Sequence, residues 1–289
     1  MWRSGWKRKV NRILLILALA YGGLALVVFL NQRGMLYHPS RDSLEALTKL
    51  AASCGFHPWT NNTGNVIGWR RHAPGKGPHP RVMIVHGNAG SAIDRVEYAD
   101  GVTRVMPADV YILEYPGYGA RPGAPTQKAL FAAADEAMTL LEKNGPVYII
   151  AESLGTGVAA YLAGTHPKSV SAMLLMAPYH NMIEVAQSHM PIFPVRLMLL
   201  DRYPAARFLR DYNGPVAVVL AGKDEVIPKR FGKHLCDDYA GPKKLWEIPT
   251  ATHNDLPDQP AEWWQELVAF WKTNTTDASS TIGQAPRAQ

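Results

Sequence analysis

Three residues have the types, and the order along the chain, that nucleophilic catalysis requires: Ser153, Asp224 and His253. A serine hydroxyl becomes a nucleophile when a neighbouring base takes its proton, and imidazole is the usual base near neutral pH. A carboxylate beside the imidazole orients the ring and stabilises its protonated form. We therefore expect Ser153 to attack a carbonyl carbon, with His253 as the base and Asp224 as the orienting acid, and water to release the acyl-enzyme.

Ser153 lies in the stretch VYIIAESLGTG, residues 147–157. Residues 147–150 form strands readily and run without a polar break into AESLG, and a run of small residues typical of a helix follows. A strand that reverses into a helix at Ser153 needs small neighbours, and Ala151 and Gly155 supply them. We interpret the stretch as a nucleophile elbow, although SxG after a strand also fits a simple tight turn.

A second stretch, HGNAG at residues 86–90, provides candidates for stabilising negative charge. It directly follows the strand-like VMIV, and its glycines permit a tight turn. We expect the backbone N–H groups of Asn88 and Leu154 to form an oxyanion hole for the charge that develops on the carbonyl oxygen. His86 is interpreted as a brace for this loop and not as a catalytic base.

Asp224 and His253 each follow a predicted strand. Asp224 comes just after VAVVL, residues 216–220, and His253 comes just after a strand that ends at Ile248. Open parallel sheets bind ligands at the carboxyl edge of their strands, so both residues are expected beside Ser153. Alone, Asp224 could be a loop cap and His253 one of ten histidines. Together, in this chain order, they predict a catalytic triad.

The body of the chain alternates strand-like and helix-like segments. Most of the predicted strands contain few polar residues, which indicates burial on both faces and a mostly parallel sheet covered by helices on each side. Helices are expected at about 126–141, from 153, at 229–239 and at 261–271. The predicted strands are 66–71, 82–85, 110–114, 147–150, 172–176, 216–220 and 244–248.

The front of the chain predicts a membrane anchor. Residues 13–30 contain no charged side chain, and a helix of that length spans roughly 27 Å. Five basic side chains precede this run and account for most of the net charge of +6, so the remaining body is nearly neutral and no nucleic-acid partner is expected. The positive-inside rule places residues 1–12 in the cytoplasm and the catalytic domain on the extracytoplasmic, for example periplasmic, side. A cleaved signal peptide is the alternative, because residues 18–20 resemble a cleavage site.

The remaining segments complete the expected domain organisation. Residues 31–64 are predicted to be a linker with one short helix near 43–53, residues 65–272 the catalytic domain, and residues 273–289 a disordered tail. Cys54 and Cys236 are too few for a disulfide framework, and two separate thiols are as plausible as one bridge.

Over about residues 65–272 the chain resembles the α/β-hydrolase superfamily. Four of its segments resemble the membrane-anchored, single-span serine hydrolases related to protein depalmitoylases and lysophospholipid lipases. These segments are HGNAG at 86–90, EYPGYG at 114–119, ESLGTG at 152–157 and AGKDEVIP at 221–228.

This resemblance implies roles for three residues. In that branch the elbow serine is the nucleophile, the aspartate after the seventh strand is the acid and the late histidine is the base, which gives Ser153, Asp224 and His253. The chain departs from the branch at Glu114, where aspartate is common, and at Ala151, where glycine is common. Neither departure removes a catalytic group.

Residues 180–209, between the sixth and seventh predicted strands, are rich in Met, Ile, Leu and Pro. Their position predicts a small lid over the triad, although packing on the sheet edge would give the same composition. The segment is too short for the cap of a large lipase. We expect six of its residues to line an acyl pocket: Met182, Met190, Ile192, Phe193, Leu197 and Met198.

Taken together, the residues predict a membrane-anchored serine hydrolase that acts on an acyl ester or thioester of a small or lipid-like molecule. No metal or organic cofactor is implied, because no Cys/His spacing suggests a metal site. An acyltransferase would use the same acyl-enzyme with an alcohol or amine in place of water. A catalytically silent scaffold could share the fold, and peptidase activity is less favoured.

Overall fold

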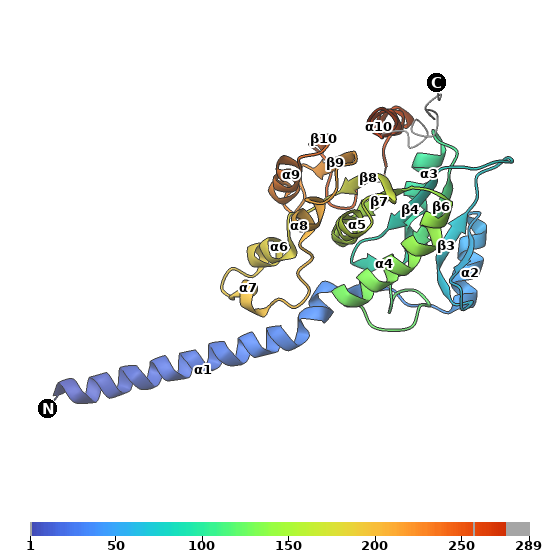
Figure 1. The fold of residues 1–289 in the computed structure, drawn as a ribbon. Helices are drawn as coiled ribbons and strands as arrows, with labels where there is room; N and C mark the ends of the chain where they lie inside the picture. Colours follow the sequence, from blue (N-terminus) through green and yellow to red (C-terminus); the bar gives the residue numbers. More distant parts are fainter. Residues whose placement is uncertain (1, 257, 276–289) are drawn as a thin grey trace, which may run out of the picture.

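An eight-stranded sheet forms the centre of the molecule (Figure 1). The computed structural model describes residues 2–256 and 258–275, so most of the tail predicted at 273–289 lies outside the described residues. The strand order is β10-β9-β8-β7-β4-β6-β3-β2; the β2–β3 and β3–β6 pairs are antiparallel and the others parallel. The strands are β2 (His57–Thr60), β3 (Val66–Arg71), β4 (Arg81–Val85), β6 (Asp109–Leu113), β7 (Val147–Glu152), β8 (Val170–Met176), β9 (Val216–Ala221) and β10 (Lys243–Ile248).

This architecture confirms the predicted mostly parallel sheet, and every predicted strand is present with small shifts at its ends. The structure adds β2, which lies inside the segment 31–64 predicted as a linker. Its sequence, HPWT, is short and contains a proline, which sheets tolerate in edge strands but not in the middle of a central strand. β2 is an antiparallel edge strand, so it did not need the long apolar run by which the other strands were predicted.

Helices cover both faces of the sheet, as predicted. Alternate residues of β4 face opposite layers: Met83 and Val85 belong to one buried cluster, Val82 and Ile84 to the other. The first cluster includes α4 (Gln127–Leu141), α5 (Leu154–Thr165), α8 (Ala205–Leu209) and α9 (Lys229–Asp238); the second includes α2 (Leu44–Ser53), α3 (Val96–Thr103) and α10 (Ala261–Asn274).

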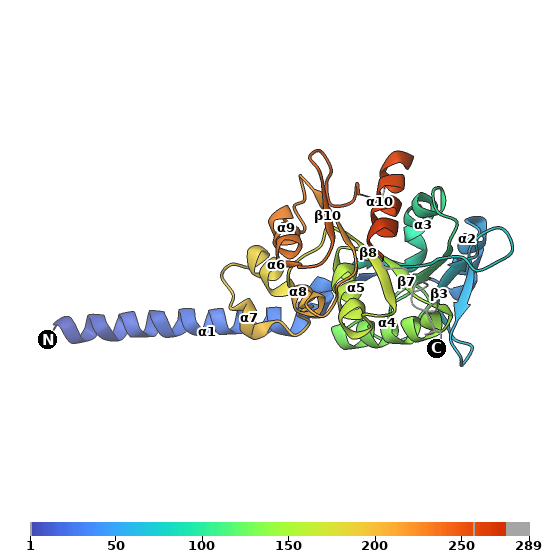
Figure 2. The ribbon, with the colours of Figure 1, turned by 45° about the horizontal axis from the view of Figure 1, so that its top comes forward.

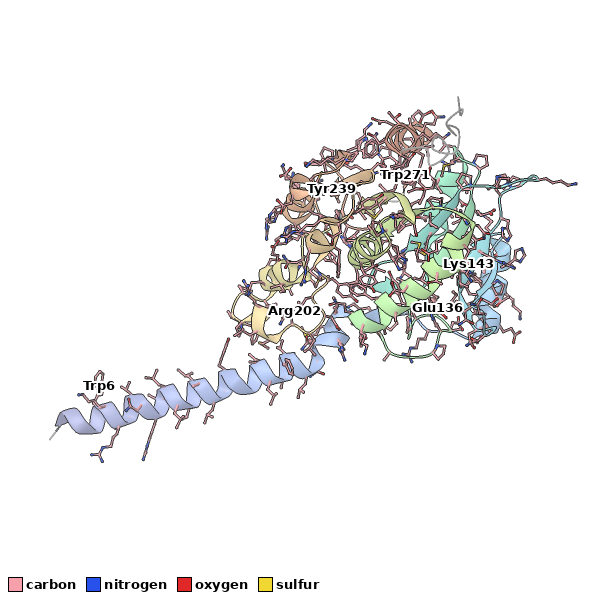
Figure 3. The ribbon with its side chains drawn as sticks, in the orientation of Figure 1. Trp6, Glu136, Lys143, Arg202, Tyr239 and Trp271 are labelled. Carbon is pink, nitrogen blue, oxygen red and sulfur yellow. The ribbon has the colours of Figure 1, made fainter. Side chains whose placement is uncertain are left out.

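A single long helix, α1 (Trp2–Leu36), projects from the body (Figures 1 and 2). The part from Trp6 to Leu36 is long and apolar enough to cross a membrane, and the most apolar window within it is not buried against the protein. Trp6 lies near its far end, away from the domain (Figure 3). The predicted span 13–30 lies inside this candidate transmembrane helix.

The segment between α1 and the sheet is more structured than a simple linker. The helix expected near 43–53 is α2, and the Ser43 hydroxyl caps it by accepting a hydrogen bond from the Ala46 N–H at 3.1 Å. Before it, β1 (His38–Pro39) pairs in parallel with β5 (Ala89–Gly90). The chain that follows α1 is therefore hydrogen-bonded to the segment predicted to carry the oxyanion hole.

Residues 180–209, called the lid from here on, lie between β8 and β9 and contain three short helices. They are α6 (Met182–His189), α7 (Val195–Met198) and α8. Figures 1 and 2 both place α6 and α7 beside the domain-proximal part of α1.

Candidate active site

Ser153 occupies a sharp turn between β7 and α5. Its backbone has φ 50° and ψ −121°, a conformation that L-residues rarely adopt and that is typical of strained functional sites. Gly155 is required by space, because a Cβ atom there would overlap the carbonyl oxygens of Val85 and His86. Ala151 is fully buried in β7 and fits the strand, so the alanine in place of the usual glycine does not prevent the turn.

The structure brings Ser153, His253 and Asp224 together. The Ser153 Oγ lies 3.0 Å from Nε2 of His253, and Nδ1 of His253 lies 2.7 Å from Oδ2 of Asp224. With its proton on Nδ1, the imidazole donates to the carboxylate and offers Nε2 as the acceptor for the serine proton. Serine, imidazole and carboxylate therefore contact one another in the sequence that an activated serine with an oriented base requires.

Backbone donors hold Asp224 and its loop in place. The second carboxylate oxygen, Oδ1, accepts hydrogen bonds from the N–H groups of Val226 at 2.9 Å and Ile227 at 2.7 Å. The Asp224 side chain is 1% exposed and that of His253 10% exposed. The carboxylate is therefore fixed by two donors on one oxygen and free to bind the imidazole with the other.

The loop that carries His253 has its own support. Oδ2 of Asp255 accepts hydrogen bonds from the backbone N–H of Thr252 at 2.8 Å and from its hydroxyl at 2.7 Å. These two hydrogen bonds hold the pKa of Asp255 below its usual value. Asp255 was not predicted as a site residue, although the sequence THND places it two residues after the histidine.

Asn88 and Leu154 both lie on the cavity beside Ser153. Leu154 is the first residue of α5, and the first N–H groups of a helix have no partner within the helix. The Asn88 side chain is turned away from this role, because its Nδ2 donates to the carbonyl of Leu36 at 2.8 Å. This leaves the two backbone N–H groups as the candidate donors for an oxyanion.

His86 is fully buried and braces the loop, as expected. Its Nδ1 lies 2.9 Å from the carbonyl oxygen of Gly87, and its ring packs on Tyr115 with centroids 4.1 Å apart. Its Nε2 lies 3.4 Å from Oε1 of Glu114. The Glu114 carboxylate accepts a hydrogen bond from the N–H of Ala92 at 3.1 Å. Glutamate, which stands here where aspartate is common, therefore contacts both His86 and the segment that follows the 86–90 loop.

A charged cluster next to the elbow was not predicted from the sequence. Glu152, directly before Ser153, accepts two hydrogen bonds from Arg95 at 2.7 and 3.2 Å and one from the Tyr98 hydroxyl at 3.0 Å. Burial, and then the Glu152 charge, raise the pKa of Tyr98 well above its usual value. The cluster joins the helical segment 92–103 to the residue that precedes the nucleophile.

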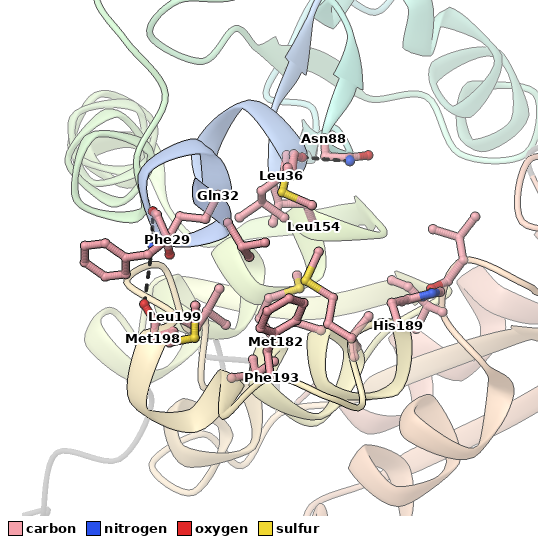
Figure 4. A pocket seen from close by; sticks show the side chains of 18 of the residues that line it. Phe29, Gln32, Leu36, Asn88, Leu154, Met182, His189, Phe193, Met198 and Leu199 are labelled. Carbon is pink, nitrogen blue, oxygen red and sulfur yellow. Dashed lines mark hydrogen bonds between the residues drawn. The ribbon is translucent and has the colours of Figure 1, made fainter. Parts of the chain in front are cut away.

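An apolar cavity of about 250 Å³ opens at Ser153 beneath the lid (Figure 4). Four of the six residues expected to line an acyl pocket do line it: Met182, Met190, Phe193 and Met198. The other two do not, since Ile192 and Leu197 are 66% and 81% exposed and point outward from the lid. Amino-acid composition could not distinguish these two residues from the four that line the cavity, because apolar side chains lie on both faces of so short a segment.

The opposite wall of the cavity comes from α1, which the sequence analysis did not assign to the site. Phe29, Gln32 and Leu36 are seen at the cavity in Figure 4, together with lid residues. A helix that is apolar on all sides carries no periodic signal that distinguishes one face. The contribution of α1 to the site therefore became visible only in the structure.

One group of side chains within the described part of the chain is arranged as metal ligands could be. Ligand atoms of His180, Glu184 and His234 lie within 4.8 Å of one another. The two imidazoles are stacked with centroids 4.0 Å apart, and Asp238 lies 2.9 Å from Nε2 of His180. The group lies between α6 and α9 and shares no residue with the cavity at Ser153.

Comparisons with known proteins agree with this architecture. A family model described as "alpha/beta hydrolase fold" matches residues 80–208. The uncharacterized protein Rv2307c of Mycobacterium tuberculosis is 30% identical over 249 residues, covering 84% of this chain and 88% of that protein. The lysophosphatidylserine lipase ABHD12 of Danio rerio is 31% identical over 191 residues, covering 58% of this chain and 49% of that protein.

Among solved structures, Est1E from Butyrivibrio proteoclasticus superposes with a TM-score of 0.60 at 18% identity, covering 76% of this chain and all of that chain. At that identity the likeness shows the fold alone. The family model, the sequence relatives and the superposition nevertheless point the same way. The chain belongs to the α/β-hydrolase superfamily, as its motifs predicted.

Proposed function

We propose that this hydrolase cleaves an ester or thioester through an acyl-enzyme on Ser153 while anchored to a membrane by α1. The observation that carries the proposal is the pair of contacts made by His253, at 3.0 Å to the Ser153 hydroxyl and 2.7 Å to the Asp224 carboxylate. A strained serine at the start of a helix, with an oriented imidazole within hydrogen-bond distance, is the arrangement that activates a hydroxyl nucleophile.

The proposed reaction has two halves. Nε2 of His253 takes the proton of Ser153 as Oγ attacks the carbonyl carbon, and the oxyanion is held by the N–H groups of Asn88 and Leu154. The tetrahedral intermediate then loses the alcohol or thiol, which leaves with the proton held by His253. In the second half, His253 deprotonates a water molecule that attacks the acyl group, and the acid is released with Ser153 restored.

The lining of the cavity favours a lipid-like acyl group. Met182, Val185, Met190 and Phe193 surround the space that leads away from Ser153, and methionines adapt to flexible chains. One relative is named a lysophosphatidylserine lipase, which is consistent with an acyl ester as the class of substrate. Oxygen esters and thioesters are therefore both included in the assay.

Replacing Ser153 with alanine tests the proposal by kinetics. We measure release of p-nitrophenol from acyl esters, and of thiol from acyl thioesters, by the full chain in detergent. Ser153→Ala is expected to lower turnover by roughly 10⁶-fold, as removal of the nucleophile does in other serine hydrolases. Ser53→Ala, at the end of α2, is the matched control and should keep wild-type turnover. Substantial turnover by Ser153→Ala would contradict the proposal.

A further inference from the structure

The last turns of α1 form one wall of the cavity at Ser153 (Figure 4). The α1 residues that line it recur one, four, seven and eight positions after the first, so they share a single helix face. The facing wall is formed by α6 and α7 of the lid. The α1 residues that line the cavity are Val28, Phe29, Gln32, Met35 and Leu36.

Polar contacts hold the lid against this part of α1 in one register. Oε1 of Gln32 accepts the N–H of Leu200 at 2.8 Å, and Nε2 of Gln32 donates to the carbonyl of Met198 at 3.3 Å. Because both ends of the amide are used, sliding the lid along the helix would break both contacts. Two further pairs continue toward the domain: Arg33 with Asp201 at 3.1 Å, and the hydroxyls of Tyr37 and Tyr203 at 2.8 Å.

The contact also extends outward along the apolar run of α1. The Tyr21 hydroxyl donates to the carbonyl of Ile192 at 2.8 Å, and its ring stacks on Phe193 with centroids 5.9 Å apart. Tyr21 precedes Leu30, the last residue of the uncharged run, by nine positions. Nine helical residues rise about 14 Å, so a bilayer that covers residues 13–30 also covers the part of the lid that contacts Tyr21. Residues 192–200 are called the lid tip from here on.

Large apolar side chains are exposed on this part of the lid, with one exposed charged residue, Arg196, among them. Ile192, Leu197 and Leu200 are 66%, 81% and 52% exposed, which is unfavourable in water and favourable among acyl chains. These side chains continue the apolar surface of α1 onto the lid. This gives Ile192 and Leu197, which lie outside the cavity, a role other than lining an acyl pocket.

We propose that the substrate is a membrane-resident lipid ester whose acyl chain enters from the bilayer between α1 and the lid. This inference rests on the proposed serine hydrolase and adds the class of substrate and its route. The lid tip lies in the acyl region of the membrane, and the chain of the lipid packs on Val28 and Phe29 on one side and on Phe193 on the other. The anchor is thus also part of the substrate-binding site.

The same arrangement brings the ester to the nucleophile. The cavity runs from the face of α1 to Ser153. The last residue of α1, Leu36, accepts a hydrogen bond from the side chain of Asn88 in the 86–90 loop, which is expected to form the oxyanion hole. A lipid that moves sideways between α1 and the lid therefore keeps its chain in apolar surroundings until its carbonyl reaches the Asn88 and Leu154 N–H groups. No transfer of the chain through water is needed.

A blocked cavity tests the role of α1. We compare the full chain in lipid nanodiscs with two variants: Val28→Trp, which fills the cavity from α1, and Leu30→Trp, a matched change on an exposed position of the same helix. The measurement is the ratio of kcat/KM for a long-chain p-nitrophenyl ester to that for the acetate. Val28→Trp should lower this ratio about tenfold, the scale at which a pocket discriminates by a missing or extra group. Leu30→Trp should leave it unchanged.

Three outcomes separate this inference from the proposed function. An equal ratio in wild type and Val28→Trp, while acetate is hydrolysed, overturns the inference and leaves the hydrolase standing. Absence of turnover of both the long-chain ester and the acetate by the wild-type chain overturns the proposed function itself. An equal fall in the ratio for both tryptophan variants also overturns the inference, because the effect would then be one of the helix and not of its cavity face.

A second measurement does not depend on activity. In a Cys54→Ser background, where Cys236 is buried, an environment-sensitive fluorophore is attached at Leu197→Cys or at Leu50→Cys in α2. In phospholipid vesicles the label at position 197 should emit at shorter wavelength and resist quenching by iodide, whereas the label at position 50 should be quenched. Equal quenching at the two positions would place the lid tip in water and overturn the proposed route.

Discussion

At the scale of residues, the histidine loop depends on one exposed carboxylate. Asp255 fixes Thr252, the residue directly before His253, through two hydrogen bonds. Because these bonds lower the pKa of Asp255, it remains a carboxylate below the pH at which an ordinary aspartate is protonated. Its contribution to the folded loop is present above the unfolded pKa and is lost as the pH falls through the lowered value.

We predict that Asp255→Ala lowers kcat by about tenfold, since a small displacement of a catalytic group costs up to 10²-fold, while the carboxylate itself takes no part in proton transfer. Asp258→Ala, a nearby exposed aspartate, is the control and should retain wild-type kcat. The measurement is kcat of the variant and of the wild type over a range of pH. A positioning role lowers kcat at every pH above the lowered pKa, whereas an unchanged kcat would show that the loop holds without Asp255.

Much of the residue-scale site was predictable because its chemistry is local. Ser153, Leu154 and Asn88 sit in turns whose small neighbours reveal the backbone geometry, and Asp224 and His253 follow strands directly. Asp255 was not predicted, because an acid two residues from a histidine has many possible partners and the sequence does not say which hydrogen bonds it forms.

At the scale of elements, the elbow is braced by a helix from elsewhere in the chain. Arg95 ends η1 (Ala92–Arg95) and Tyr98 lies in α3, and both bind Glu152 at the end of β7. Arg95 and Glu152 are each 15% exposed, so the pair lies largely out of water. Removing one partner leaves the other charge buried and unpaired, which is more costly than removing both.

We predict that Arg95→Met lowers the free energy of unfolding by about 3 kcal/mol and that the double variant Arg95→Met, Glu152→Gln recovers part of that loss. Arg104→Met, just after α3, is the control. Chemical denaturation of the detergent-solubilised chain gives the four free energies of the double-mutant cycle. Additive losses would contradict the prediction, since they would mean that the two side chains do not interact energetically.

Element positions were predictable where burial dominates the sequence. β4 and β9 are buried at every position; β9 is an unbroken apolar run, and so is β4 after its first residue, Arg81. β2 and the Arg95–Glu152 pair were not predictable. Edge strands need little hydrophobic pattern, and the pairing of residues 57 positions apart is decided by how the helices pack.

At the scale of the whole molecule, the charge distribution predicts the orientation of α1 in a membrane. Basic residues are concentrated before the apolar run, and Arg33, the first charged residue after it, is paired with Asp201 of the lid. The positive-inside rule therefore predicts that the N-terminus lies in the cytoplasm and the catalytic domain on the other side of the membrane. The ion pair joins the end of the helix to the lid.

We predict that external protease added to intact cells digests the catalytic domain and spares a tag placed before residue 1. Replacing Lys7, Arg8, Lys9 and Arg12 with glutamate should reduce the fraction of the catalytic domain that the external protease digests, because the charge bias that orients the helix is lost. The control change Lys272→Glu in α10 should leave the digested fraction unchanged. A domain that is protected until the cells are opened would contradict the predicted orientation.

The whole-molecule arrangement was only partly predictable. The anchor and the domain were each indicated by composition, but their contact was not. α1 meets the lid through Tyr21, Gln32 and Arg33, whose side chains gave no sequence pattern pointing to residues 192–201. Contacts between segments more than 160 positions apart follow from the folded shape, so the joint site of α1 and the lid needed the structure.

The central claim is that Ser153 is an activated nucleophile, and the most direct measurement is labelling of the purified full chain with a fluorophosphonate probe. Mass spectrometry of the digested protein locates the adduct, and the rate is compared with that of His253→Ala. We predict one adduct on Ser153, absent in Ser153→Ala and formed much more slowly in His253→Ala. A folded protein that forms no adduct, or an adduct on another serine, would contradict the account.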